Sequence, residues 1–251
     1  MDITLNSIDA VVTDAPLPFV PRLALDMPQV IVGGFASRAE FEQQTRTTYG
    51  SLQWLWSEED DLRFDKESHE LVGVGLHMPN EAAPAEAGIH ILDELPTLRG
   101  GLRANEVRDF GMPQATMLHC DTEAAELICL RDPAVPDAPL EARIGIAPGL
   151  ALLVQDGAVV GWSLADPARY LTSGYTAPDQ SPPSPDTRRQ SAECLALLTR
   201  PLVDEVTDKE PSAWHRLRTA ERVLRNQRED RRRAEILHRL VIRMIEDYEN
   251  W

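Results

Sequence analysis

The sequence predicts an α+β protein with a mainly antiparallel sheet domain, few helices within that domain, and a helical C-terminal segment. Two observations predict this class. Up to residue 175, short apolar runs alternate with polar residues and are separated by Gly, Pro and Asp turns. Beyond a proline-rich segment, the apolar period changes from two to 3.6 residues, which is typical of helices. We therefore expect an acidic α+β domain at 1–175, a proline-rich linker at 176–188 and a helical region at 189–251.

The N-terminal part predicts strands before its first helix. Residues 3–12 are typical of an opening strand or a short turn and strand, and residues 29–33 form an apolar strand that ends at two glycines. Ser37 and Glu40 have the spacing of a capping box, in which the hydroxyl accepts from an unpaired N–H group and the carboxylate reaches back. A helix over 38–49 is expected to follow.

Two groups of antiparallel strands are expected next. Runs at 52–57, 62–64 and 70–78 predict a three-stranded meander. Runs at 143–146, 150–155 and 159–164 predict the clearest hairpins of the chain. Asp156-Gly157 is the strongest hairpin signal, because both residue types tolerate positive φ.

The C-terminal region predicts helices that are interrupted by charge. One helix is expected over 189–199, and Pro211-Ser212 is expected to begin a longer one. Apolar residues share one face on both sides of 225–233, a stretch that is almost wholly charged. That stretch predicts either a solvent-exposed crossing or a break near residues 228–230.

Composition limits the class of protein. The chain has 251 residues, 43% of them hydrophobic and 26% charged, a balance typical of globular domains. The N-terminus has no secretory pattern, and no apolar run reaches the roughly 18–20 residues of a membrane span. Three cysteines without a disulfide spacing favour reduced thiols and a cytoplasmic location. Basic residues are arginine except at Lys66 and Lys209, which indicates a GC-rich, bacterial genome.

The charge is strongly negative and unevenly placed. The net charge is −16. Residues 211–251 hold ten arginines and seven acidic residues, a balance of +3, so residues 1–210 hold 15 basic and 34 acidic residues, a balance of −19. Such a surface repels nucleic acid and anionic lipid and attracts a basic partner. Solubility alone is the simpler explanation of the same charge.

No motif of the sequence predicts catalysis, and we expect no cofactor, no metal and no catalytic residue. The six histidines and three cysteines lack the close spacings of zinc ligands. There is no nucleophile elbow of the Gly-x-Ser-x-Gly type. The turn at Gly33-Gly34 lacks both the phosphate-loop lysine and the dinucleotide glycine pattern.

Two charged segments are candidate contact surfaces. Glu58, Glu59, Asp60 and Asp61 are expected to form a solvated acidic turn that binds a basic partner, with Trp56 as an anchor beside it. The arginines of the charged helical stretch could contact nucleic acid or a partner, although interspersed acids reduce the field and no aromatics are interleaved for stacking. That second set comprises Arg228, Arg231, Arg232 and Arg233.

Residues 143–171, RIGIAPGLALLVQDGAVVGWSLADPARYL, resemble a hairpin-and-turn pattern of small bacterial conflict-system proteins, in particular immunity proteins of polymorphic toxins. The resemblance covers under a fifth of the chain, and no residue role can be transferred through it. It implies a protein without enzymatic activity that inhibits a toxin by occluding its active site.

We therefore expect a protein-binding module, an immunity or antitoxin-like inhibitor or a related defence-system subunit, which engages a basic protein. Two alternatives stay open. One is an enzyme whose site is assembled from dispersed residues such as His77, His119 and Cys120. The other is a nucleic-acid-linked regulator that acts through the arginine-rich helix.

Overall fold

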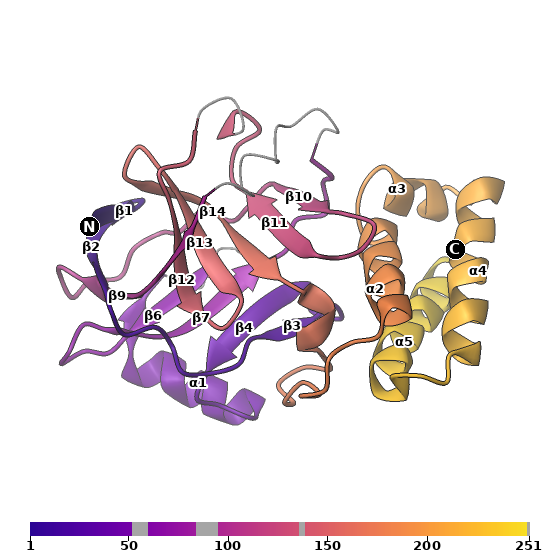
Figure 1. Cartoon of the computed structure of the whole chain (residues 1–251), viewed down its shortest axis with the longest axis horizontal. Helices are drawn as coiled ribbons and strands as arrows, with labels where there is room; N and C mark the ends of the chain where they lie inside the picture. Colours follow the sequence, from indigo (N-terminus) through magenta and orange to yellow (C-terminus); the bar gives the residue numbers. More distant parts are fainter. Residues whose placement is uncertain (52–59, 84–94, 136–138, 250–251) are drawn as a thin grey trace.

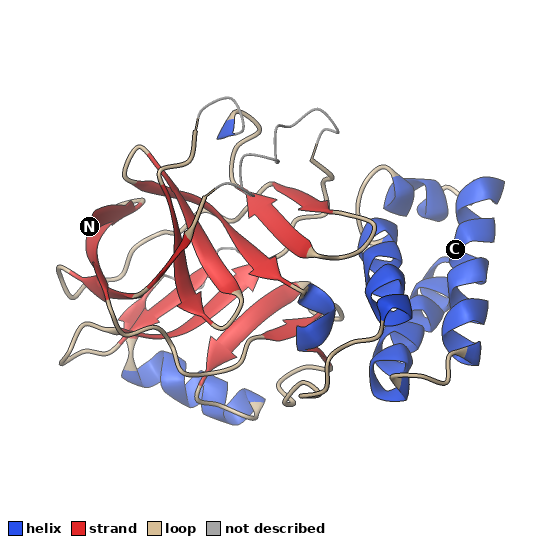
Figure 2. Cartoon of the chain, in the orientation of Figure 1, coloured by secondary structure: helices blue, strands red, loops and turns tan. Residues whose placement is uncertain are grey.

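The computed structural model confirms the predicted α+β class. It describes residues 1–51, 60–83, 95–135 and 139–249. Two β-sheets fill one side of the molecule, and the helices that follow residue 184 gather at the other (Figures 1 and 2). The N-terminus lies in the sheet region and the chain ends in the helical region.

The larger sheet has nine strands. Its main path runs β8-β12-β13-β14-β1-β2-β9, and β11 pairs with both β14 and β10. Neighbours are antiparallel except for β1 with β14 and β8 with β12. Its strands are β1 (Asp2–Leu5), β2 (Ile8–Thr13), β8 (Thr97–Arg99), β9 (Gly101–Ala104), β10 (Met117–Cys120), β11 (Glu126–Leu130), β12 (Ala142–Ala147), β13 (Leu150–Gln155) and β14 (Ala158–Ala165).

The smaller sheet has six strands in the order β15-β3-β4-β7-β6-β5. The β6–β7 pair of the expected meander is present, but its first expected strand, at 52–57, lies outside the described residues. The strand that flanks β7 on its other side is β4. The strands are β3 (Arg22–Ala24), β4 (Gln29–Gly33), β5 (Tyr49–Gly50), β6 (Asp61–Phe64), β7 (Leu71–His77) and β15 (Leu171–Thr172).

The predicted hairpin at Asp156-Gly157 joins β13 to β14. Both residues take positive φ, 50° and 72°, as a turn of two such residues requires. The N-terminal residues also form a hairpin, β1–β2, where a single strand or turn and strand was expected, because Asn6 turns the chain at φ 63°. Asparagine tolerates this conformation better than most residues.

Helix α1 (Arg38–Thr47) lies across one face of the smaller sheet (Figure 1). Ser37 caps it as predicted, because its Oγ accepts from Glu40 N at 3.3 Å. The Glu40 carboxylate accepts from Ala36 N at 2.7 Å, one residue before the capping-box position. The helix ends two residues earlier than expected, where Tyr49 begins a strand.

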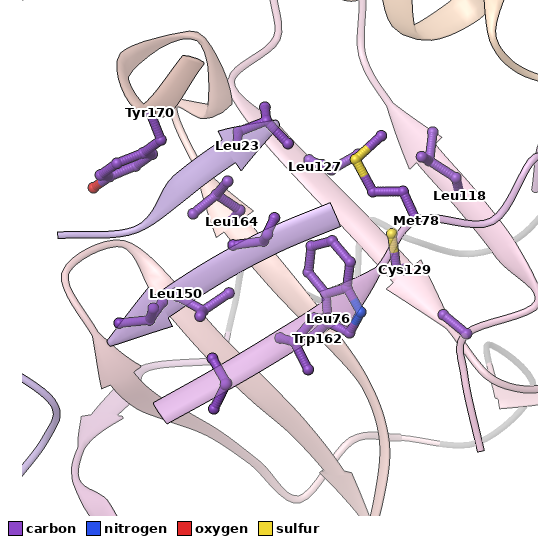
Figure 3. Packing of buried hydrophobic residues seen from close by; sticks show 14 of the residues in the cluster. Leu23, Leu76, Met78, Leu118, Leu127, Cys129, Leu150, Trp162, Leu164 and Tyr170 are labelled. Carbon is purple, nitrogen blue, oxygen red and sulfur yellow. The ribbon is translucent and has the colours of Figure 1, made fainter. Parts of the chain in front are cut away.

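The two sheets enclose one hydrophobic core. Trp162 of β14 is 1% exposed and lies among side chains of both sheets, with Leu76 of β7 and Cys129 of β11 close to it (Figure 3). The pleat explains which strand residues face inward, since alternate side chains of β13 and β14 point to the core. A large aromatic ring at this place fills the space between the sheets.

The helical region has four helices, and the charged stretch forms a break, one of the two alternatives expected for it. Helix α4 ends at Asn226, and α5 begins at Arg231. Buried residues of α5, such as Leu237 and Val241, belong to the same hydrophobic cluster as the sheet residues. The helices are α2 (Pro185–Leu197), α3 (Leu202–Thr207), α4 (Pro211–Asn226) and α5 (Arg231–Glu249).

The proline-rich segment lies against α5. Helix α2 begins at Pro185, inside the expected linker, because Ser184 caps it and a proline suits the first helical position. Pro178 and Pro183 are buried.

Within the described residues, no helix combines the length and the apolar character that crossing a bilayer requires.

Candidate functional site

The predicted acidic turn is not a solvated surface where the structure describes it. Asp60 is 1% exposed and Asp61 is 0% exposed, so the expectation that they face a partner is wrong. Trp56, Glu58 and Glu59 lie outside the described residues. Sequence reasoning failed here because a run of acids normally indicates solvent, whereas Asp61, the first residue of β6, and Asp60, the residue before it, are buried in the interior.

The Asp60 carboxylate is held by His77, the last residue of β7, and by Arg131, the residue that follows β11. Its Oδ1 accepts from His77 N at 2.9 Å, and its Oδ2 lies 3.8 Å from Arg131 Nη2. Burial raises the pKa of the Asp60 carboxyl to about 7, although the hydrogen bond and the arginine favour the charged form. The Arg131 guanidinium also donates to Val159 O through Nη1 at 2.6 Å. Asp60 therefore has a structural role inside the protein.

Asp61 has a similar structural role. Ser51 Oγ donates to its Oδ1 at 3.2 Å, and Arg63 Nη1 lies 3.5 Å from the same oxygen. Burial raises the pKa of the Asp61 carboxyl to about 6. Arg63 in turn donates to Ser51 O and Thr45 O at 3.0 and 2.7 Å, which ties α1 and the end of β5 to β6.

The four predicted arginines divide into two pairs. Arg233 is 0% exposed and pairs with Asp230 at 2.9 Å. Arg232 donates to Ala177 O at 3.0 Å. Both bind the chain's own backbone, Arg233 in the interior and Arg232 from an exposed position. Arg228 and Arg231 are exposed at the turn between α4 and α5.

The dispersed histidine and cysteine residues do not form a nucleophilic site. His119 and Cys120 are neighbours on β10, so their side chains point to opposite faces of the strand. Burial raises the pKa of the Cys120 thiol to about 12, which leaves it protonated and weakly nucleophilic at neutral pH. Within the described ranges, no three His, Cys, Asp or Glu side chains gather closely enough to hold a metal ion.

One hollow on the described surface is a groove at the seam between the sheets and the helices. We call it the seam groove; its volume is about 610 Å³. The loop that joins β10 and β11 forms one wall and reaches towards α2 (Figure 1). Helices α2 and α4 form the rest. The lining residues are Cys120, Asp121, Thr122, Glu123, Arg189, Gln190, Ala192, Glu193, Ala196, His215, Arg216, Thr219, Ala220 and Val223.

The seam groove has an apolar floor. Ala192 and Ala196 of α2 lie one helical turn apart and face Ala220 and Val223 of α4. Val223 is 41% exposed. Small side chains allow another chain to approach closely, and the valine offers apolar contact.

The rim of the seam groove is charged, with unneutralised acids on the loop. Arg216 binds both carboxylate oxygens of Glu193 at 2.5 and 2.7 Å, so this pair is internally balanced. Asp121 and Glu123 are exposed and form no ion pair with any residue in the described ranges. The loop wall therefore presents two free negative charges to whatever enters.

Sequence reasoning missed the seam groove, because its lining comes from three segments that extend from Cys120 to Val223 along the chain. Comparison with models of protein families, with curated proteins and with solved structures found no match to this chain.

Proposed function

We propose that this chain is a protein-binding module and that its seam groove receives a basic segment of a partner protein. The observation that carries the proposal is the combination of an apolar floor and an acidic loop wall in one hollow. An apolar centre with a charged rim is the usual anatomy of a protein interface. The occupant that fits is a segment with a small apolar anchor flanked by Lys or Arg.

Electrostatics support the choice of a basic partner. The whole chain carries −16, and the wall residues Asp121 and Glu123 are not neutralised by cations of the described chain. A negative field increases the rate at which a basic protein associates and disfavours acidic competitors.

The biological class that we propose is an inhibitor of the immunity or antitoxin type, or a related subunit of a bacterial defence system. Its support is the resemblance of residues 143–171 and the acidic surface, since a basic toxin domain has the charge that this surface attracts. In this proposal the chain acts by covering the partner's functional surface, and it performs no chemistry of its own.

The test is affinity capture from the native host with three baits: wild type, Val223→Glu and Leu98→Glu. Val223 lies on the groove floor, and Leu98 on β8 is a matched control because it is 50% exposed and lies outside the groove. We expect a basic partner that binds wild type and the control, and that is lost in Val223→Glu.

Binding should also weaken as salt rises from about 0.05 to 0.5 M, because exposed charges are screened. Glu123→Lys should reduce the rate of association. Capture of the same proteins by all three baits, or an acidic partner whose binding ignores salt, would overturn the proposal.

A further inference from the structure

A second hollow lies at the turn between α4 and α5 and has a different chemistry from the seam groove. We call it the arginine pocket. Its volume is about 640 Å³, within the roughly 300–1,000 Å³ of small-molecule sites. It takes residues from the last turn of α4, the connecting turn and the first two turns of α5. The polar lining residues are Arg225, Asn226, Gln227, Arg228, Arg231, Glu235 and His238.

The arginine pocket is positive on a strongly negative protein. Three arginines and one glutamate line it, a balance of +2, whereas the whole chain carries −16. Spacing explains the gathering, because Arg225, Arg228 and Arg231 lie three residues apart where the chain reverses direction. Each guanidinium is exposed, so the three can converge on one ligand.

The three arginines are not equally engaged. Arg225 lies 3.5 Å from Glu221, which also lies 3.2 Å from His238 Nε2. Arg231 pairs with Glu235 at 2.8 Å. Arg228 forms no hydrogen bond or ion pair with any residue in the described part of the chain. It is the free cation of the pocket.

We propose that the arginine pocket binds a small oxyanion with two or more negative charges, such as the diphosphate group of a nucleotide. A guanidinium offers parallel N–H donors that match phosphate oxygens. Arg228 makes the first contact, and Arg225 and Arg231 turn from their exposed ion pairs, which solvent screening keeps weak, to the ligand.

A small anion fits better than a nucleic acid. A long polyanion that entered the pocket would have to run over the rest of a surface that carries a large negative charge, and that repulsion opposes binding. A ligand confined to the pocket meets only its local positive field. In addition, the lining contains no Trp, Tyr or Phe on which bases could stack.

The experiment is calorimetric titration of the full chain with inorganic pyrophosphate, ADP and a 12-nucleotide single-stranded DNA at about 0.1 M salt. The variants are Arg228→Ala and Arg46→Ala. Arg46 is a matched control because it is also an exposed arginine without a partner in the described chain, and it lies on α1. Circular dichroism of each variant checks that the fold is unchanged.

We expect pyrophosphate and ADP to bind, with an affinity that falls about tenfold in Arg228→Ala and less than twofold in Arg46→Ala. One lost charge-assisted contact of about 1.5 kcal/mol corresponds to that factor. Three outcomes would overturn the proposal: no heat with pyrophosphate or ADP at millimolar concentration, equal losses in both variants, or DNA that binds more tightly than ADP. The last result would assign the pocket to nucleic acid.

Discussion

Arg233 on α5 donates through Nη2 to the backbone oxygen of Asp179 at 2.8 Å, from a position that is 0% exposed. The same nitrogen donates to Ser181 O at 2.6 Å, while Nη1 binds both carboxylate oxygens of Asp230 at 2.9 and 3.0 Å. One side chain thus fixes the start of α5 to the proline-rich segment. A residue that sequence reasoning places on a contact surface is in fact an internal clamp.

Replacing this clamp should destabilise the fold strongly. Arg233→Ala leaves the Asp230 carboxylate and two backbone oxygens without their donor in the interior, and breaking a buried pair costs about 3–5 kcal/mol. We expect the urea midpoint to fall accordingly. Arg228→Ala is the control, because that exposed side chain has no partner in the described chain, and its effect should stay within about 0.5 kcal/mol. Equal midpoints for the two variants would contradict the clamp.

The sheets and helices should unfold together. Leu237 of α5 and Leu152 of β13 are buried in the same hydrophobic cluster, at 0% and 1% exposure. Replacing either by Ala should cost about 2–5 kcal/mol. We expect one transition in each variant, with helix circular dichroism and tryptophan fluorescence changing at the same urea concentration. If Leu237→Ala lowered the urea midpoint of the helix circular dichroism signal and left the midpoint of tryptophan fluorescence unchanged, the helices would be an independent folding unit.

The free energy of unfolding should fall as pH rises from about 4 to about 7. In this range the Asp60 carboxyl is ionised in the unfolded chain but still carries its proton in the folded chain. The folded pKa is raised to about 7 from an ordinary 3.8, so the folded state keeps the proton between about pH 4 and pH 7. This contribution is therefore fully present below about pH 4 and is lost as pH approaches 7, at up to about 1.4 kcal/mol per pH unit.

Asp60→Asn should remove that part of the pH dependence. We expect the free energy of unfolding of the variant, relative to wild type, to rise between pH 4.5 and pH 7. Asp26→Asn, at an exposed position, is the matched control and should follow wild type. Parallel curves for wild type and Asp60→Asn would show that the buried carboxyl does not titrate in this range.

Gly161 should tolerate no side chain. A Cβ there would lie 2.3 Å from Cys129 O, and β14 cannot retreat because β11 and β13 pair with it on both sides. Gly161→Ala should cost several kcal/mol in urea unfolding. Gly157→Ala, where φ is 72° and no atom lies within 4 Å, should cost only about 1–2 kcal/mol of backbone strain. A larger loss of stability in Gly157→Ala than in Gly161→Ala would contradict the packing of β14.

Local patterns predicted local structure well. The Asp156-Gly157 turn, the Ser37 cap and the break after Asn226 depend on residues that are close in sequence, and each is present. Burial was harder to predict. Asp60 and Asp61 look like a solvated acidic run, because the arginines that accompany them in the interior come in part from a distant strand.

The seam groove shows the same limit, since three distant segments form it and no single one carries a signature. The arginine stretch was correctly identified as charged, and the helix break is one of the two alternatives that were expected for it. The sequence could not tell which arginines point inwards, because that depends on the carbonyl groups of residues 179 and 181 across the fold.

The proposed interface can be located most directly by hydrogen–deuterium exchange of the chain with and without its captured partner. Exchange reports the backbone amides that become protected on binding. We predict protection confined to residues 120–123, 189–196 and 215–223, the segments that line the seam groove. Protection at β8, β9 or α1, with none at these three segments, would contradict the proposal that this protein binds its partner through the seam groove.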